Sequence, residues 1–367
     1  MESSLSPFYY NCRMKLFIFS LVFLLPLTSY AKSVKKPEAN IEKRAPLANA
    51  AAPIVLTQDK PNFCIIGAQS GKDFRSEAAF KSVVWKSDVV YVGENHDEPL
   101  DHMAQLEALK AMRIARGSKI AVGFEMVVST LQPVLDDYAA GKITEDEFRE
   151  KAGWKTGKGF DFGLYKPLFD FVIQHKLRAL ALNVPRSIVK KIARTGLESL
   201  TPEEKQHLPP DFTVTKHKKY NDYLKESFSG HGSTSTVTTF AFDNYLASMA
   251  AWNEGMGSRI VTFLNENPGY SVLVIAGNGH LVYNAAIPAS VKARLKGLRQ
   301  ASFLTENALK CPETMPKEHK DMANYIWYIN HPPKPEPVIT PSTSAPATLP
   351  LSTATLPSPT PAAPPGR

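Results

Sequence analysis

Two short apolar runs, each ending in Gly-x-x-His, constrain the fold of this chain more than any other feature. Residues 89–92 precede Gly-Glu-Asn-His, and residues 272–276 precede Gly-Asn-Gly-His. Such short runs, rich in β-branched residues, are typical of buried strands. A glycine after each run would let the chain turn sharply and place a histidine three residues later. Because ligands of parallel α/β sheets bind at the carboxyl ends of the strands, His96 and His280 are predicted to share one site.

Strand and helix patterns alternate through the middle of the chain. Further strands are predicted over 120–126, 178–184 and 325–329, and helices over 99–116, 165–176, 240–267 and 288–296. This alternation predicts an α/β fold with a mostly parallel sheet flanked by helices. Residues 127–165 and 197–240 are expected to form an inserted helical lid over the strand ends.

The N-terminal residues 1–31 are predicted to be a signal peptide. Lys15 precedes an apolar stretch over 16–27, and Ser-Tyr-Ala follows at 29–31. These are the three parts of a secretory signal, and Met14 competes with Met1 as the start. The apolar stretch is shorter than the roughly 20 residues that span a bilayer, which favours a cleaved signal. A retained membrane anchor is the alternative.

Residues 32–61 read as a flexible leader, and residues 331–367 as a disordered tail rich in Pro, Thr, Ser and Ala. Such a composition buries too little apolar surface to fold. Residues 62–330 are therefore the predicted folded domain. No lipobox cysteine follows the signal, and we expect an exported protein, either periplasmic or associated with the outer membrane.

Cysteine usage and charge add weaker constraints. In an oxidising compartment Cys64 and Cys311 would form one disulfide, and two unpaired buried thiols are the alternative. The formal net charge is +8, with the lysines scattered along the chain. That surplus is consistent with an acidic ligand or a membrane surface, but a solvated basic surface is the favoured interpretation. No nucleic-acid motif is present, and no nucleic-acid partner is expected.

Polar side chains follow each of four predicted strands. They are Glu94, His96, Asp97 and His102 after the first, Glu125 after the second, Asn183 and Arg186 after the third, and His280 after the fourth. Buried charges are rarely kept without partners, so one interpretation is a structural ion pair between Glu125 and Arg186. The other is a convergent ligand site.

These motifs together resemble a known family. Gly-Glu-Asn-His, His102-x-x-Gln105, Gly-Phe-Glu-Met, Asn-Val-Pro-Arg and Gly-Asn-Gly-His follow in the order typical of ChaN proteins, from about residue 88 to 330. This is the haem-binding uptake group of the Tiki/TraB/erythromycin-esterase superfamily. The resemblance implies an α/β core with a helical subdomain and haem binding in bacterial iron uptake. It also implies a homodimer around the haem, with tyrosine and histidine near the iron.

Two departures from the family pattern bear on function. Family members often carry a lipid-anchor cysteine, which this chain lacks. The family run Ala-Gln-x-x-x-Asp-x-x-Met-Ala here has Phe242 and Leu246 at its Gln and Asp positions, unless Asp243 substitutes from one turn away. This weakens a hydrolytic interpretation and favours an apolar wall suited to a flat porphyrin.

Haem binding is therefore the leading hypothesis. Iron can be held by histidine or by a tyrosine oxygen, and an arginine fork matches a propionate carboxylate. Tyr138 and Tyr165 are candidate ligands, Arg186 is a candidate propionate partner, and His96 and His280 are candidate ligands or donors. The full predicted set for the cofactor is His96, His102, Glu125, Tyr138, Tyr165, Asn183, Arg186 and His280.

The alternative is a metal-dependent hydrolase, either a Tiki-like peptidase or esterase-like. His96, Glu125 and His280 would hold a divalent metal ion with an open position for water, and Glu94 would act as general base. Neither His-Glu-x-x-His nor Gly-x-Ser-x-Gly is present to support it. A third class is a scaffold with a vestigial site. We predict an exported haem-binding protein with an envelope or receptor partner.

Overall fold

The computed structural model of the chain describes residues 61–156, 160–231 and 241–330. The predicted signal peptide, nearly all of the leader and the tail lie outside these residues. Within them, no helix combines the length and the apolar character that a membrane span requires.

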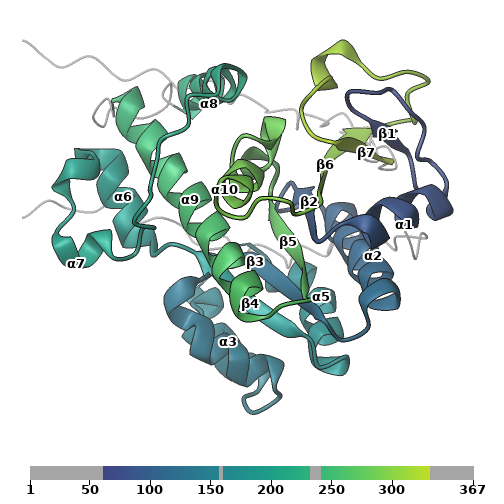
Figure 1. Cartoon of the computed structure of the whole chain (residues 1–367). Helices are drawn as coiled ribbons and strands as arrows, with labels where there is room; N and C mark the ends of the chain where they lie inside the picture. The colour runs from purple at the N-terminus through teal and green to yellow at the C-terminus, as the bar shows by residue number, and fades with distance from the viewer. Residues whose placement is uncertain (1–60, 157–159, 232–240, 331–367) are drawn as a thin grey trace, which may run out of the picture. The chain divides into compact units, whose positions relative to one another are not determined.

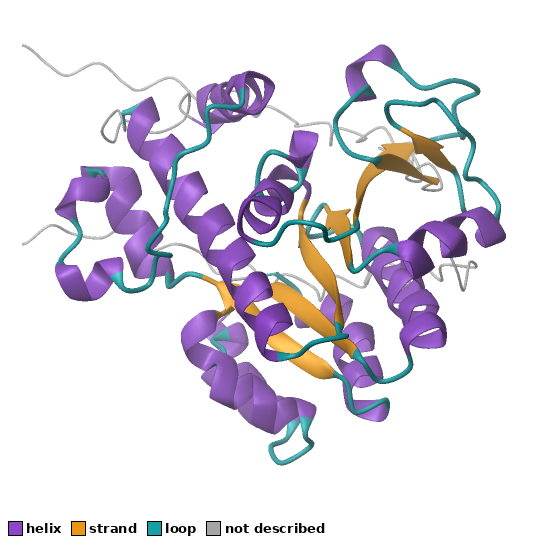
Figure 2. Cartoon of the chain, in the orientation of Figure 1, coloured by secondary structure: helices purple, strands orange, loops and turns teal. Residues whose placement is uncertain are grey.

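A seven-stranded sheet forms the centre of the described chain (Figures 1 and 2). Its order is β1 (Ile65–Gly67), β7 (Tyr325–Asn330), β6 (Gln300–Ala308), β2 (Val89–Glu94), β5 (Ser271–Gly277), β3 (Ile120–Val128) and β4 (Arg178–Asn183). All neighbours run parallel except β1, which pairs antiparallel with β7. The predicted α/β class is confirmed, and β1 and β6 are strands that the sequence patterns did not reveal.

Both faces of the sheet are buried, which explains the unbroken apolar runs. In β2, Val90 and Val92 face one core cluster, and Val89 and Tyr91 face the other. The first cluster includes side chains of α1 (Glu77–Lys86), α2 (Pro99–Arg116), α3 (Gln132–Ala139) and α5 (Phe162–Gln174). The second includes side chains of α8 (Lys218–His231), α9 (Phe242–Glu266) and α10 (Ile287–Arg294).

The predicted lid is only partly a lid. Leu135 of α3 and Phe148 of α4 (Glu145–Lys151) are buried in the first core cluster, so this part packs against the sheet. Phe160 and Tyr165, in contrast, reach the strand ends. In the second segment α6 (Arg186–Thr195), which follows β4, packs on α9, and α7 (Pro202–Lys205) follows it. Residues 232–240 lie outside the described chain. The short 3₁₀ helices are Ser129–Leu131, Trp154–Thr156, Leu197–Ser199, Asn278–His280, Val282–Asn284 and Lys317–His319.

The two motif glycines are needed for a reason other than the one predicted. Neither Gly93 nor Gly277 has a positive φ, so the backbone conformation at these positions does not itself require glycine. A Cβ at Gly93 would lie 2.0 Å from Asn278 Oδ1, and a Cβ at Gly277 would lie 3.0 Å from His96 Nε2. Each glycine thus lets a side chain of the other Gly-x-x-His motif approach its backbone closely.

The outer edge of β4 is occupied by one side chain. Gln132 Nε2 donates to the Ala179 carbonyl at 2.9 Å, and Gln132 Oε1 accepts from the Ala181 N–H at 2.8 Å. The Ala181 carbonyl accepts from Arg259 Nε at 2.6 Å. Backbone groups that an edge strand leaves unpaired are therefore satisfied within the chain.

A disulfide joins Cys64 and Cys311, with their Cα atoms 5.7 Å apart. It connects the residue before β1 to the segment between β6 and β7, 247 residues apart in sequence. The structure therefore favours the disulfide over two free thiols.

Candidate functional site

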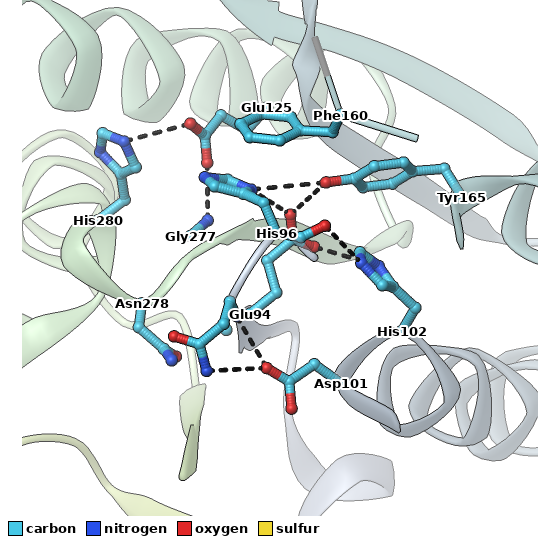
Figure 3. A network of polar contacts seen from close by, with 12 residues as sticks. Glu94, His96, Asp101, His102, Glu125, Phe160, Tyr165, Gly277, Asn278 and His280 are labelled. Atoms are coloured by element: carbon cyan, nitrogen blue, oxygen red, sulfur yellow. Dashed lines mark hydrogen bonds and ion pairs between the residues drawn. The ribbon is translucent and has the colours of Figure 1, made fainter. Parts of the chain in front are cut away.

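The two Gly-x-x-His motifs meet at one edge of the sheet. Strands β2 and β5 are parallel neighbours, and Glu94 stands opposite Gly277 in their register. The histidines that follow these strands therefore start from adjacent strand ends. Figure 3 shows the polar network that results, with His96 lying between Glu94 and Glu125.

Glu94 accepts hydrogen bonds from three directions at the end of β2. The Tyr165 hydroxyl and His96 Nδ1 each lie 2.6 Å from Oε1, and Gln105 Nε2 lies 2.7 Å from Oε2. Glu94 is only 2% exposed. A buried carboxylate remains stable when its lone pairs are used in this way, and an ionised carboxylate can only accept. The hydrogen bond therefore places a proton on His96 Nδ1.

His96 is the most accessible imidazole of the network. Its side chain is 29% exposed, against 4% for His102 and 9% for His280. The ring of Phe160 stacks on it with centroids 3.8 Å apart. Burial disfavours the charged form, but the hydrogen bond to Glu94 and the negative charges of Glu125 and Glu94 outweigh it and raise the pKa of His96.

The Tyr165 hydroxyl is buried with its partner. The residue is 0% exposed, and its ring lies edge-on to His102 at 4.5 Å between centroids. Burial and the adjacent Glu94 carboxylate raise the pKa of Tyr165 far above its ordinary value. The phenol therefore stays protonated and donates to Glu94.

Glu125 organises the other half of the network from β3. Its Oε2 accepts from the Gly277 N–H at 2.7 Å, and its Oε1 lies 3.2 Å from His280 Nε2. Burial opposes ionisation, but the charge and hydrogen bond of His280, the charge of His96 and the Gly277 N–H lower the pKa of Glu125 to about 2. Glu125 is therefore an ionised partner of His280 at neutral pH.

A chain of hydrogen bonds behind His280 fixes the orientation of its ring. Asn253 Oδ1 lies 2.7 Å from His280 Nδ1, and Asn253 Nδ2 donates to the Tyr220 hydroxyl at 2.9 Å. Tyr220 in turn donates to the Gly279 carbonyl at 3.2 Å. Because the Asn253 amide donates to Tyr220, its oxygen faces His280, which places a proton on His280 Nδ1.

Asp101 fixes the loop that carries His96. Its Oδ2 accepts from the Asn95 N–H at 2.8 Å, the Asn95 side-chain amide at 3.1 Å and the Thr305 hydroxyl at 2.9 Å. Burial raises the pKa of Asp101 to about 7, against the hydrogen bonds from Asn95 and Thr305 that lower it. Asn95, the residue before His96, is thus hydrogen-bonded to Asp101 of α2, which in turn is hydrogen-bonded to Thr305 of β6.

An apolar hollow of about 180 Å³ lies beside this network, between α2 and α5. It is lined by Pro99, His102, Met103, Leu106, Gly163, Leu164 and Pro167. His102 connects the two features, because it lines the hollow and its Nε2 lies 3.2 Å from the His96 carbonyl. The hollow therefore adjoins the network at His102, which contacts the backbone of His96.

The structure gathers most of the predicted site residues but not all. His96, His102, Glu125, Tyr165 and His280 belong to the network or touch it. Tyr138 does not, since it is 4% exposed and stacks on Phe148 in the core, with centroids 4.3 Å apart.

At the end of β4, Asn183 is partly buried, with a side-chain oxygen that lacks a partner among the described residues. Arg186 is exposed at the start of α6. The alternative interpretation, a structural ion pair between Glu125 and Arg186, is wrong, because Glu125 pairs with His280.

The predicted metal site is not supported by the geometry. Among the described residues, no group of three His, Cys, Asp or Glu side chains is arranged to hold a metal ion. Glu125 and His280 bind each other, and both oxygens of Glu94 already accept hydrogen bonds. The structure therefore does not support His96, Glu125 and His280 as metal ligands, nor Glu94 as a general base.

Four site residues escaped sequence reasoning. Asn253 and Tyr220 lie on helices far from either motif, and Phe160 and Asp101 look like ordinary loop and helix residues. Asn253 alone carried a usable signal, because it is an amide among apolar residues on the buried side of α9. A buried amide needs partners, which marks it for a polar network.

Fold and site together define an α/β protein with a carboxylate–histidine network at its strand ends. A family model described as "Haem-binding uptake, Tiki superfamily, ChaN" matches residues 82–291. The chain belongs to this family.

A solved ChaN structure supports the same fold. The chain is similar to a structure described as cofacial haem binding to ChaN of Campylobacter jejuni, with a TM-score of 0.57 and 18% identity, covering 74% of this chain and 98% of that chain. An erythromycin esterase mutant in its open conformation has a TM-score of 0.37 and 11% identity, covering 66% of this chain and 77% of that chain. A type III effector also has a TM-score of 0.37 and 11% identity, covering 68% and 91%. The last two are too distant to bear on this chain. No curated protein matches it.

Proposed function

We propose that this protein binds haem and handles haem or iron at the bacterial envelope after export. Membership of a haem-binding family supports haem as the ligand, and the ChaN structure has a similar fold. The pattern of residues 1–31 and the disulfide between Cys64 and Cys311 support export, since disulfides persist in oxidising compartments.

The observation that carries the proposal is the Glu94–His96 pair, which His102 connects to an apolar hollow. A histidine that ligates a metal usually donates its other ring N–H to a carboxylate, which fixes the ring. His96 Nδ1 lies 2.6 Å from Glu94, and the ring is partly exposed. His96 is therefore our candidate for the iron ligand, with the hollow supplying apolar contact for the porphyrin.

The size of the hollow bears on the oligomeric state. At about 180 Å³ it is smaller than the roughly 300–1,000 Å³ of pockets that enclose a ligand. A porphyrin would lie against this surface with one face uncovered. A second copy of the chain would cover that face, so we propose a homodimer around the ligand, with an envelope or receptor partner for delivery.

A haem titration of the full chain, followed by visible absorbance, tests the ligand. We expect a saturable Soret band near one haem per chain, abolished in His96→Ala and retained in Tyr138→Phe, whose ring lies in the core. Folding of each variant is checked by circular dichroism. Absence of a saturable band, with one tightly held divalent metal instead, would overturn haem binding and favour the hydrolase alternative.

A further inference from the structure

Helix α6 carries a row of unpaired positive charges. Its sequence, from Arg186 to Thr195, contains four basic residues and no acidic one. Arg186, Lys190 and Arg194 are spaced four apart and all are exposed; we call them the α6 basic row. The opposite face of the helix is buried, through Ile188, Val189 and Ile192. Residues four apart are neighbours on one side of a helix, so the three basic side chains lie on the same side of α6.

Within the described part of the chain, none of the three residues of the α6 basic row has a hydrogen-bond or ion-pair partner. Lys86, Lys151 and Lys292 are also exposed without a described partner, but each lies on a different helix, whereas three such cations lie together on α6. Lys191, also on α6, pairs with Glu204 at 2.6 Å. Several lysines on other helices pair with an acidic residue one turn away, as in Lys81–Glu77, Lys166–Asp170 and Lys218–Asp222. The α6 basic row thus leaves three positive charges for a partner outside the described chain.

The first residue of the row stands where a cation is unfavourable. Arg186 opens α6, and Pro185 before it provides no side-chain cap. The N-terminus of a helix carries partial positive charge, so an arginine there is destabilised unless an anion is near. The position of Arg186 therefore adds to the evidence for an anionic partner.

The row has the features of a site for a flat anionic surface. Protein interfaces centre on buried aromatic or aliphatic side chains, whereas the exposed large hydrophobic residues of the described chain are Trp85, Ile114, Phe160, Val214 and Leu309, none of them on α6. The row extends over about 12 Å, at about 1.5 Å per residue. Basic amphipathic helices commonly lie on membrane surfaces, where each cation is attracted to anionic lipids.

We propose that the α6 basic row docks the protein onto the phosphate headgroups of an anionic membrane. The contact is electrostatic and involves no insertion, because the apolar face of α6 is already packed on α9. Helices α2 and α5, which border the haem hollow, pack on the other face of the sheet. Docking through Lys190 and Arg194 is therefore independent of the proposed haem site.

Sedimentation of the full chain with lipid vesicles tests the proposal. We expect binding to vesicles of mixed phosphatidylglycerol and phosphatidylcholine above the background seen with pure phosphatidylcholine. Lys190→Gln and Arg194→Gln should each weaken it about fivefold, the change that about 1 kcal/mol per cation produces. Binding should be largely lost at about 0.5 M salt, where the charges are screened.

Lys191→Gln is the matched control, because it removes the same charge from the same helix but from a residue paired with Glu204. It should bind nearly as well as the native chain. The proposal is overturned if both vesicle compositions bind equally, if Lys191→Gln weakens binding as much as Lys190→Gln, or if the double variant binds like the native chain. Tighter binding to duplex DNA than to the anionic vesicles would also overturn it, in favour of a general polyanion site.

Discussion

Replacing Tyr165 by phenylalanine removes one hydroxyl from the centre of the network and changes little else. The ring is retained, so its edge-on contact with His102 and the packing against Trp154 should persist. What is lost is the 2.6 Å hydrogen bond to Glu94 Oε1, which afterwards accepts only from His96.

The expected cost follows from the nature of this bond. Hydrogen bonds to charged groups contribute roughly 1.5–3 kcal/mol to stability. Because Tyr165 is 0% exposed and Glu94 is 2% exposed, water cannot readily replace the hydroxyl. We therefore expect Tyr165→Phe to lower the free energy of unfolding by about 2 kcal/mol. For a domain of this size, that loss corresponds to a melting temperature roughly 4–8 °C lower.

Tyr138→Phe is the matched control for this prediction. Tyr138 is also buried, at 4% exposed, but no hydrogen bond joins its hydroxyl to another described residue. Its ring stacks on Phe148 whether or not the oxygen is present. We expect a change within about 0.5 kcal/mol. Urea unfolding of both variants by circular dichroism would refute the reasoning if the two lost equal stability, or if Tyr165→Phe lost none.

Three further outcomes follow from the structure. Replacing Cys64 and Cys311 by serine should lower the free energy of unfolding by about 5 kcal/mol in the chain-entropy model, because the bond closes a loop of 247 residues; reducing the native chain should cause the same loss. Gly277→Ala should displace His96, since the new Cβ would lie 3.0 Å from its Nε2, and an altered imidazole NMR shift would report it. The pKa of Glu125 is lowered from 4.5 to about 2, which contributes about 3 kcal/mol to the free energy of unfolding. This contribution is present above pH 4.5 and is lost as the pH falls towards 2. Acid unfolding of Glu125→Gln should lack this pH dependence.

The sequence predicted best those features that depend on local pattern. The run at 89–92 and its counterpart at 272–276 are buried on both faces, so their strands and their histidines were readable. Strand β6 was missed because Thr305, Glu306 and Asn307 interrupt its apolar character. The Thr305 hydroxyl donates a hydrogen bond to Asp101 of α2.

Side-chain partners were harder to predict than strands. Glu125 was recognised as a site residue, but the only ion-pair partner considered for it was Arg186, whereas the structure pairs it with His280. Tyr138 and Tyr165 looked equivalent, yet one lies in the core and the other hydrogen-bonds Glu94. Such pairings depend on how helices pack across the sheet, and no local pattern encodes that geometry.

The Gln132 side chain that occupies the edge of β4 limits how copies of this chain can associate. An open parallel edge invites another strand, and sheets that grow in this way lead to aggregates. Here one amide imitates the peptide group of a neighbouring strand, pairing with Ala179 and Ala181. Extension of the sheet by another strand is therefore blocked at this edge. Gln132→Ala would free the Ala179 carbonyl and the Ala181 N–H, and would open this edge to a strand of a second copy.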